Sequence, residues 1–132
     1  MTLRYSTTII ADRLTQLNTD IGINAILRIY TGAQPASVAI AATGTLLVSL
    51  PCSGTAFGAV ASGALTANAI ATTAAAATGT AGYFRLFKAD GTTAAVDGSV
   101  GTSASDINLN STSITSGQNV SITSFVITGA PV

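Results

Sequence analysis

The chain has 132 residues, enough for one hydrophobic core but not two, so we expect a single domain over residues 1–132. Hydrophobic residues make up 48% of it and charged residues only 8%, with a formal net charge of zero, which excludes a disordered chain and leaves little repulsion between copies. The five basic residues are scattered and form no basic stripe, so no nucleic-acid partner is expected.

The first segment predicts an amphipathic helix over residues 6–22. Its apolar residues recur at helical spacing and form one stripe, made of Ile10, Leu14, Leu17 and Ile21. Ser6 or Thr7 can cap its start, and Gly22 can end it in a left-handed conformation. The stripe packs either on the chain's own core or on a neighbouring subunit, so we treat its four residues as candidate interface residues.

After the helix the pattern changes to the two-residue period of β-strands, and we expect a β body over residues 25–132. The first strand, 25–31, has Leu27 and Ile29 on one face and Ile26, Arg28 and Tyr30 on the other. A loop is expected at 31–37, a second strand at 45–50, and a third around 64–72.

The region 56–82 is rich in alanine and free of charge, yet it contains very few large apolar residues. Alanine and threonine gain too little from lipid to drive spanning, so we expect no membrane partner. The first eight residues likewise lack the apolar core of a secretory signal. Within this region, 72–80 predicts an exposed loop or edge strand, or else a contact surface between copies.

The segment 83–88 gives the clearest hairpin signal, because Asp90-Gly91 forms a turn that returns the chain into a strand at 94–100. We expect Phe84 and Leu86 to face the core. Tyr83 and Phe87 lie on the opposite face, which we expect a loop, the N-terminal helix or another subunit to cover, so both are further candidate interface residues.

The last third of the chain predicts further short strands. Ile107 and Leu109 alternate, 116–118 is a turn, and Val120, Ile122 and Val126 are expected core positions. Together these patterns predict a mainly β fold, an antiparallel β-sandwich or jelly-roll-like domain with one N-terminal amphipathic helix.

The chain contains no histidine and no glutamate, the residues on which acid–base catalysis most often draws. Cys52 is the single cysteine, so it forms no disulfide within the chain, and we expect it to be a small buried hydrophobe. We interpret Asp90 and Asp97, which flank the hairpin, as turn residues. We therefore expect no enzyme and no cofactor.

Asp106, Asn108 and Asn110 alternate, so on a strand their oxygens project from one face. Such oxygens suit a hard cation such as calcium, but three ligands from one strand rarely suffice. A solvated polar strand face is the favoured interpretation, and we expect no metal site.

Several blocks of the sequence, in this order, resemble small virion proteins encoded by tailed bacteriophages and prophages. The blocks are MTLRYSTTIIADRLTQLNTDIG with LRIYTGAQPAS, PCSGTAFGAVASGALTANAI, GTAGYFRLFKADGTTAAVDGSVG and DINLNSTSITSGQNVSITSFVIT. The resemblance covers most of the chain and implies a non-enzymatic virion structural protein with no catalytic residues. It also implies location in the virion, after assembly in the host cytoplasm.

Within a virion, the best match is a capsid decoration or cement protein that binds the head lattice and stabilises it. Its partners would be itself, as a homo-oligomer, and other virion proteins such as the major capsid protein. A neck, collar or tail accessory subunit is the alternative. A receptor- or glycan-binding module is a third possibility, and it requires exposed aromatic side chains on a β face.

Overall fold

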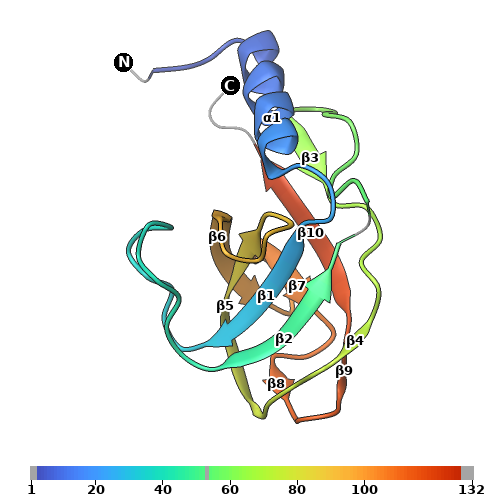
Figure 1. The fold of residues 1–132 in the computed structure, drawn as a ribbon. Helices are drawn as coiled ribbons and strands as arrows, with labels where there is room; N and C mark the ends of the chain where they lie inside the picture. Colours follow the sequence, from blue (N-terminus) through green and yellow to red (C-terminus); the bar gives the residue numbers. More distant parts are fainter. Residues whose placement is uncertain (1–2, 53, 129–132) are drawn as a thin grey trace.

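The computed structural model describes residues 3–52 and 54–128, so residues 129–132 of the predicted β body lie outside the described part. The chain is mainly β, with one N-terminal helix (Figure 1). The elements are α1 (Thr7–Ile21), β1 (Ile26–Thr31), β2 (Leu46–Pro51), β3 (Ala64–Thr66), β4 (Thr73–Ala74), β5 (Gly79–Phe87), β6 (Ala94–Gly101), β7 (Ile107–Leu109), β8 (Ser113–Ile114), β9 (Asn119–Val120) and β10 (Ile122–Thr128).

Helix α1 begins and ends where the sequence predicts. The Ser6 hydroxyl accepts a hydrogen bond from the Ile9 backbone N–H at 3.2 Å, which caps the first turn. Gly22 has φ +75° and donates its N–H to the Asn18 carbonyl at 3.2 Å, which ends the helix in a conformation that favours glycine.

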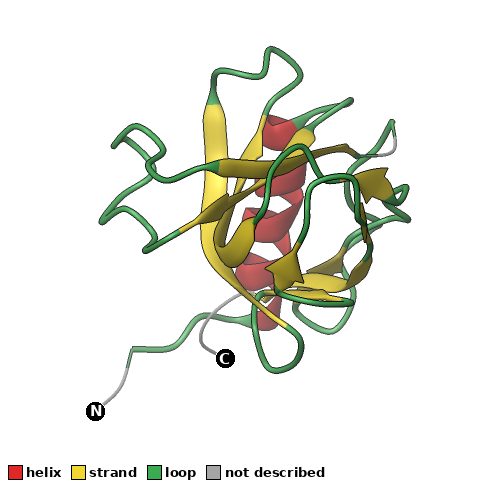
Figure 2. Ribbon diagram, turned by 90° about the horizontal axis from the view of Figure 1, so that it is seen from below, coloured by secondary structure: helices red, strands yellow, loops and turns green. Residues whose placement is uncertain are grey.

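Most of the strands form one curled sheet in the order β2-β1-β5-β6-β7-β10-β3, with β8 paired to β5. Strands β4 and β9 form a separate pair. Seen from below, the strands curl round one another and α1 lies behind them (Figure 2). The fold is therefore broadly β-sandwich-like, as predicted.

The prediction of a purely antiparallel sheet is wrong at one pair. Strands β6 and β7 run parallel, with Val100 opposite Ile107. The segment 102–106 turns the chain out of the sheet and returns it alongside β6 in the same direction, so the two strands do not form a hairpin. The sheet is consequently mixed.

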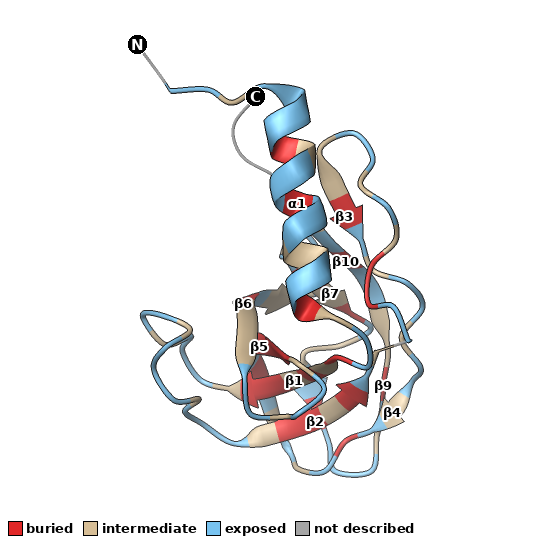
Figure 3. Cartoon of the chain, turned by 45° about the horizontal axis from the view of Figure 1, so that its top comes forward, coloured by how far each residue is buried: buried red, intermediate tan, exposed pale blue. Residues whose placement is uncertain are grey.

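The main core fills the interior of the curl, where α1 meets the inner faces of the strands (Figure 3). Phe125 stands at its centre and makes edge-to-face contacts with Phe57 and Phe84, both with ring centroids 5.1 Å apart. Phe84 and Leu86 are fully buried, so the prediction that they face the core is confirmed.

A second, smaller cluster lies on the outer face of β1 and β5. It consists of Tyr30, Tyr83 and Phe87, and the rings of Tyr30 and Tyr83 stack with centroids 5.2 Å apart. Arg28 places its guanidinium 4.8 Å from the Phe87 ring centroid and donates to the Gly91 carbonyl. Both faces of β5 are therefore covered, as the sequence predicts.

Some strand predictions are wrong in extent or phase. The strand expected around 64–72 ends at Thr66, and Val126 is exposed while Phe125 is buried. An irregularity in the pairing between Ile122 and Ser124 shifts the alternation along β10, which exchanges the inward and outward positions. In the alanine-rich stretch, Thr73–Ala74 pairs with β9 as the edge-strand interpretation predicts, whereas Ala75 is buried.

Candidate functional site

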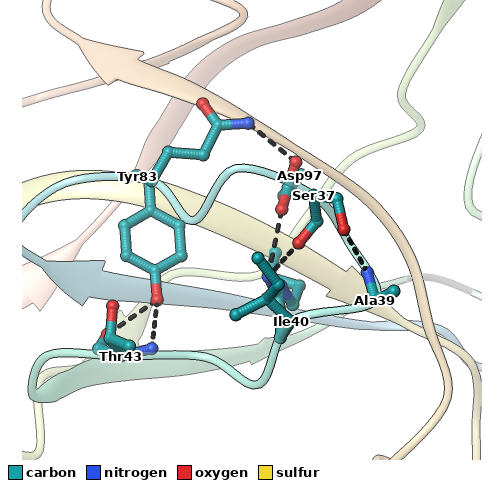
Figure 4. Close-up of polar contacts among 8 residues, drawn as sticks. Ser37, Ala39, Ile40, Thr43, Tyr83 and Asp97 are labelled. Carbon is teal, nitrogen blue, oxygen red and sulfur yellow. Dashed lines mark hydrogen bonds and ion pairs between the residues drawn. The ribbon is translucent and has the colours of Figure 1, made fainter.

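The long connection between β1 and β2, residues 32–45, lies over the outer face of β5 and is held there by polar contacts (Figure 4). We call this connection the strap. At one end, the Tyr83 hydroxyl donates to the Thr43 carbonyl at 2.6 Å and accepts from the Thr43 N–H at 2.9 Å. One phenol thus satisfies both backbone polar groups of Thr43 and holds the strap over the second cluster, to which Tyr83 belongs.

The centre of the strap is fixed by Arg85, a buried side chain on β5. Its Nη1 donates to the Ile40 carbonyl at 2.7 Å, and its Nη2 lies 3.5 Å from the Ser37 carbonyl. The same Nη2 pairs with Asp97 Oδ2 at 3.1 Å, and Gln34 donates to Asp97 Oδ1 at 2.7 Å. The ion pair and the strap carbonyls therefore form one network.

This ion pair is removed from solvent, because the Arg85 and Asp97 side chains are 3% and 7% exposed. A buried pair gains little net stability, since desolvation offsets the Coulomb attraction, but it fixes geometry. The hydrogen bonds of the guanidinium to the strap and to Asp97 are made by Nη1 and Nη2. Arg85 Nε has no hydrogen-bond partner within the described residues. The network's principal effect is to position the strap.

The strap is also seated on a close backbone approach between two glycines. A Cβ atom at Gly82 would lie 1.9 Å from the Gly32 carbonyl oxygen and 2.7 Å from the Gly32 nitrogen. Any larger residue at Gly82 would have to push the start of the strap away from β5.

The predicted interface residues of the helix lie in the chain's own core. Ile10, Leu14 and Ile21 are buried, and Leu17 is half-buried against the same cluster. Of the two alternatives that the sequence leaves open, packing on the chain's own core is the one observed, because the sheet curls far enough to meet the stripe.

The other two candidate interface residues, Tyr83 and Phe87, are also buried within the chain. The strap covers Tyr83, and Arg28 covers Phe87. Of the three kinds of cover that the sequence allows for this face, a loop is the one observed over Tyr83. The connection is longer than the predicted loop at 31–37, since β1 ends at Thr31 and β2 begins at Leu46, and its added length reaches over Tyr83.

The described residues do expose five large apolar side chains: Leu3, Ile9, Ile23, Ile40 and Val126. Sequence reasoning missed these as candidates for contact with a partner. The exposure of Ile9 could have been predicted, because Ile9 is a large apolar residue that lies outside the helical stripe. Ile40 is 47% exposed and lies in the strap, whose position is set by contacts with distant residues such as Arg85, so the local sequence held no signal for it.

Two titratable groups outside the network, Cys52 and Asp90, have pKa values shifted by their surroundings. Burial raises the pKa of the Cys52 thiol to about 11, partly offset by a backbone hydrogen bond at Leu27. Cys52 is half-buried against the main core, which is less complete burial than predicted.

Asp90 behaves as the predicted turn residue and accepts hydrogen bonds from the Thr92 and Thr93 N–H groups. The interpretation of Asp97 as a turn residue is wrong, because it pairs with Arg85.

The three alternating polar residues, Asp106, Asn108 and Asn110, make hydrogen bonds to neighbouring segments of the chain. Asp106 accepts from the Ser99 N–H and hydroxyl at 3.0 Å each. Asn108 donates to the Ser124 hydroxyl, and Asn110 accepts from the Ser121 N–H. In the part of the chain that the structure describes, no three His, Cys, Asp or Glu side chains gather in a group able to hold a metal.

Comparisons of the chain with protein-family models, with curated proteins and with solved structures found no match. Within residues 3–52 and 54–128, no helix has the length and apolar character needed to cross a membrane.

Proposed function

We propose that the chain is a non-enzymatic virion structural protein of a tailed bacteriophage, most specifically a decoration protein that binds the head lattice. The resemblance of its sequence blocks to small virion proteins is the starting point. The observation that carries the proposal is that the surface combines exposed apolar side chains with very few charges. Among the described residues, five large apolar side chains are exposed, while the Arg85–Asp97 pair removes two of the ten charged residues of the sequence from solvent.

The strap network supports a structural role over a chemical one. Arg85 and Asp97 spend their polar atoms on the strap and on each other, so this cluster positions a loop. The loop in turn presents Ile40 to the outside from a fixed base. A loop that is held by several hydrogen bonds and exposes an apolar side chain is suited to repeated contact with a lattice, because less conformational entropy is lost on binding.

A receptor- or glycan-binding role receives less support. Six of the seven aromatic side chains are buried, and Tyr5 is half-buried beneath Arg13. Sugar binding usually uses an aromatic ring face exposed on the protein surface. A neck, collar or tail position agrees with the exposed apolar residues as well as a head position does, so copy number has to separate them.

Quantitative mass spectrometry of purified particles tests the proposal directly. A decoration protein is expected at hundreds of copies per particle, whereas a dozen or fewer would place the chain in the neck or tail. Absence of the chain from particles, together with glycan binding by the purified protein, would overturn the virion structural proposal. Ile40→Asp and Ile23→Asp, compared in binding to particles that lack the chain, then test which of these two exposed side chains contacts the shell.

A further inference from the structure

We propose that the strap opens and closes as a unit on an otherwise folded chain, and that it thereby gates the aromatic side chains of the second cluster. The structure shows the closed position. The strap covers an apolar face of the sheet, but nearly all of the contacts that hold it there are polar.

The strap buries little of its own surface. None of residues 32–45 is buried, and only Pro35, Val38 and Ala42 are half-buried. Of these three, Ala42 packs against the second cluster. By contrast, half of the residues in each of the flanking strands, β1 and β2, are buried. A segment with so few buried apolar contacts has low local stability, so it opens at a smaller free-energy cost than the strands do.

Side chains of the sheet, rather than strand pairing, anchor the middle of the strap. Among the described residues, no hydrogen bond between backbone groups joins residues 33–44 to another element. The anchors are the Tyr83 hydroxyl at Thr43 and the Arg85 guanidinium at Ile40 (Figure 4). Each such bond contributes little net stability, because water replaces it when the strap lifts. The strap can therefore open without breaking the ladder of the sheet.

Both ends of the strap have the properties of a hinge. The Thr31 N–H donates to the Thr45 carbonyl at 3.0 Å, and the Thr45 N–H donates to the Thr31 hydroxyl at 2.8 Å. Gly32 and Gly44 lie just inside these two bonds, with φ of +86° and +81°. Glycine leaves such a conformation at little cost, so rotation at these two residues swings the strap while its base stays closed.

Opening would uncover one face of β5 and leave the other face closed. The stacked rings of Tyr30 and Tyr83 and the Arg85–Asp97 pair would meet water, whereas the main core lies on the opposite side of the sheet. Ile40 moves with the strap. A partner that binds Ile40 only in its closed position would hold the strap shut, so contact at Ile40 and exposure of Tyr83 are coupled.

Amide hydrogen exchange of the full chain, measured by NMR at low urea concentrations, tests for local opening. The Thr43 N–H should exchange at least about tenfold faster than amides in the middle of β5, at a rate that urea hardly changes. Exchange of Thr43 as slow as that of β5, with the same urea dependence, would overturn the proposal, because the strap would then open only by global unfolding. Exchange at the rate of an unstructured peptide would overturn the closed position.

Gly32→Ala and Gly117→Ala form a matched pair of variants that tests the hinge. Both glycines have φ +86°, and no atom lies within 4 Å of a Cβ built on either, so each substitution adds backbone strain without a clash. Opening of the strap relieves the strain at residue 32 only. Gly32→Ala should therefore speed Thr43 exchange about five- to thirtyfold, and Gly117→Ala should leave it unchanged. Equal acceleration in both variants, or none in Gly32→Ala, would overturn the hinge.

Nitration of tyrosine by tetranitromethane, located by mass spectrometry, measures exposure of the gated face itself. All chains carry Cys52→Ala, because a thiol competes for the reagent. Nitration of Tyr83 should accelerate in Gly32→Ala by about the same factor as Thr43 exchange, while Tyr5, which lies outside the strap, should react at an unchanged rate. Faster Thr43 exchange with unchanged nitration of Tyr83 would show that the strap moves without gating the cluster, and would overturn the proposal.

Discussion

Arg85 and Asp97 lie directly opposite each other on β5 and β6, and their ion pair is sealed beneath the strap. The pair joins the β5–β6 hairpin to the strap, which is distant in sequence, because Arg85 also binds the Ile40 carbonyl and Asp97 also accepts a hydrogen bond from Gln34. A single cross-strand contact thus connects the sheet to the longest loop on its outer face.

Replacing Asp97 with Asn should destabilise the chain by about 3 to 5 kcal/mol, because Arg85 would remain buried without its counter-charge. The free energy of unfolding in urea measures this loss. Asp12→Asn, at an exposed helix position, is the control and should change stability by less than about 0.5 kcal/mol. A loss for Asp97→Asn as small as that of the control would mean that the pair is hydrated in solution.

Replacing Gly82 with Ala should cost about 1 to 3 kcal/mol and loosen the strap, because the new methyl group collides with the Gly32 backbone. Faster cleavage of residues 32–45 by a protease of broad specificity would report the loosening. Gly54→Ala is the matched control, since no atom lies within 4 Å of its built Cβ. Equal stability of the two variants would argue against the close approach.

Replacing Leu14 with Asp should abolish the cooperative thermal transition of the isolated chain, because the helix stripe packs on the chain's own core. Circular dichroism during heating is the measurement. Ile9→Asp, on the exposed side of the same helix, should leave the transition in place. A Leu14→Asp chain that still melts cooperatively would contradict the packing of α1 described above.

Truncating Phe84 to Ala should cost about 3 to 5 kcal/mol, because its ring fills the main core against Phe125. Phe87→Ala should cost less, since that ring lies in the smaller cluster under Arg28. Denaturant titration of both variants gives the comparison. The assignment of the two strand faces would be refuted by a Phe84→Ala loss below about 1 kcal/mol, or by a larger loss for Phe87→Ala.

Asp90 should contribute stability that is lost in acid. Hydrogen bonds from the Thr93 hydroxyl and N–H, and then from the Thr92 N–H, lower its pKa from 3.8 to about 2. The contribution is complete above pH 3.8 and disappears as the pH falls through about 2, because protonation of Asp90 weakens these bonds. Thr93→Val should raise the pKa and flatten stability in that window. A carboxyl titration by NMR that is unchanged in Thr93→Val would contradict this.

Local patterns predicted the parts of the fold that depend on local physics. Ser6 and Gly22 mark the ends of α1 because capping needs particular residue types at particular positions. The faces of β5 were predictable because Phe84 and Leu86 alternate with Tyr83 and Phe87.

Features set by distant contacts were not predictable from sequence. The role of Asp97 depends on its register with Arg85, and its place near a turn signal favoured the wrong interpretation. Val126 was expected to be buried because the pairing irregularity in β10 leaves no trace in the apolar pattern. The full extent of the strap was not predicted either, because its position is set by hydrogen bonds to Tyr83 and Arg85, about 40 residues further along the chain.

Helix α1 and strand β10, which lie far apart in the sequence, are joined through β3. Helix α1 packs against β3, and β3 joins the main sheet through β10, the last described strand (Figure 1). The seat of the first helix is therefore incomplete until β10 has been synthesised and paired with β3. The core consequently depends on contacts between segments that are far apart in the sequence, and such contacts form slowly during folding.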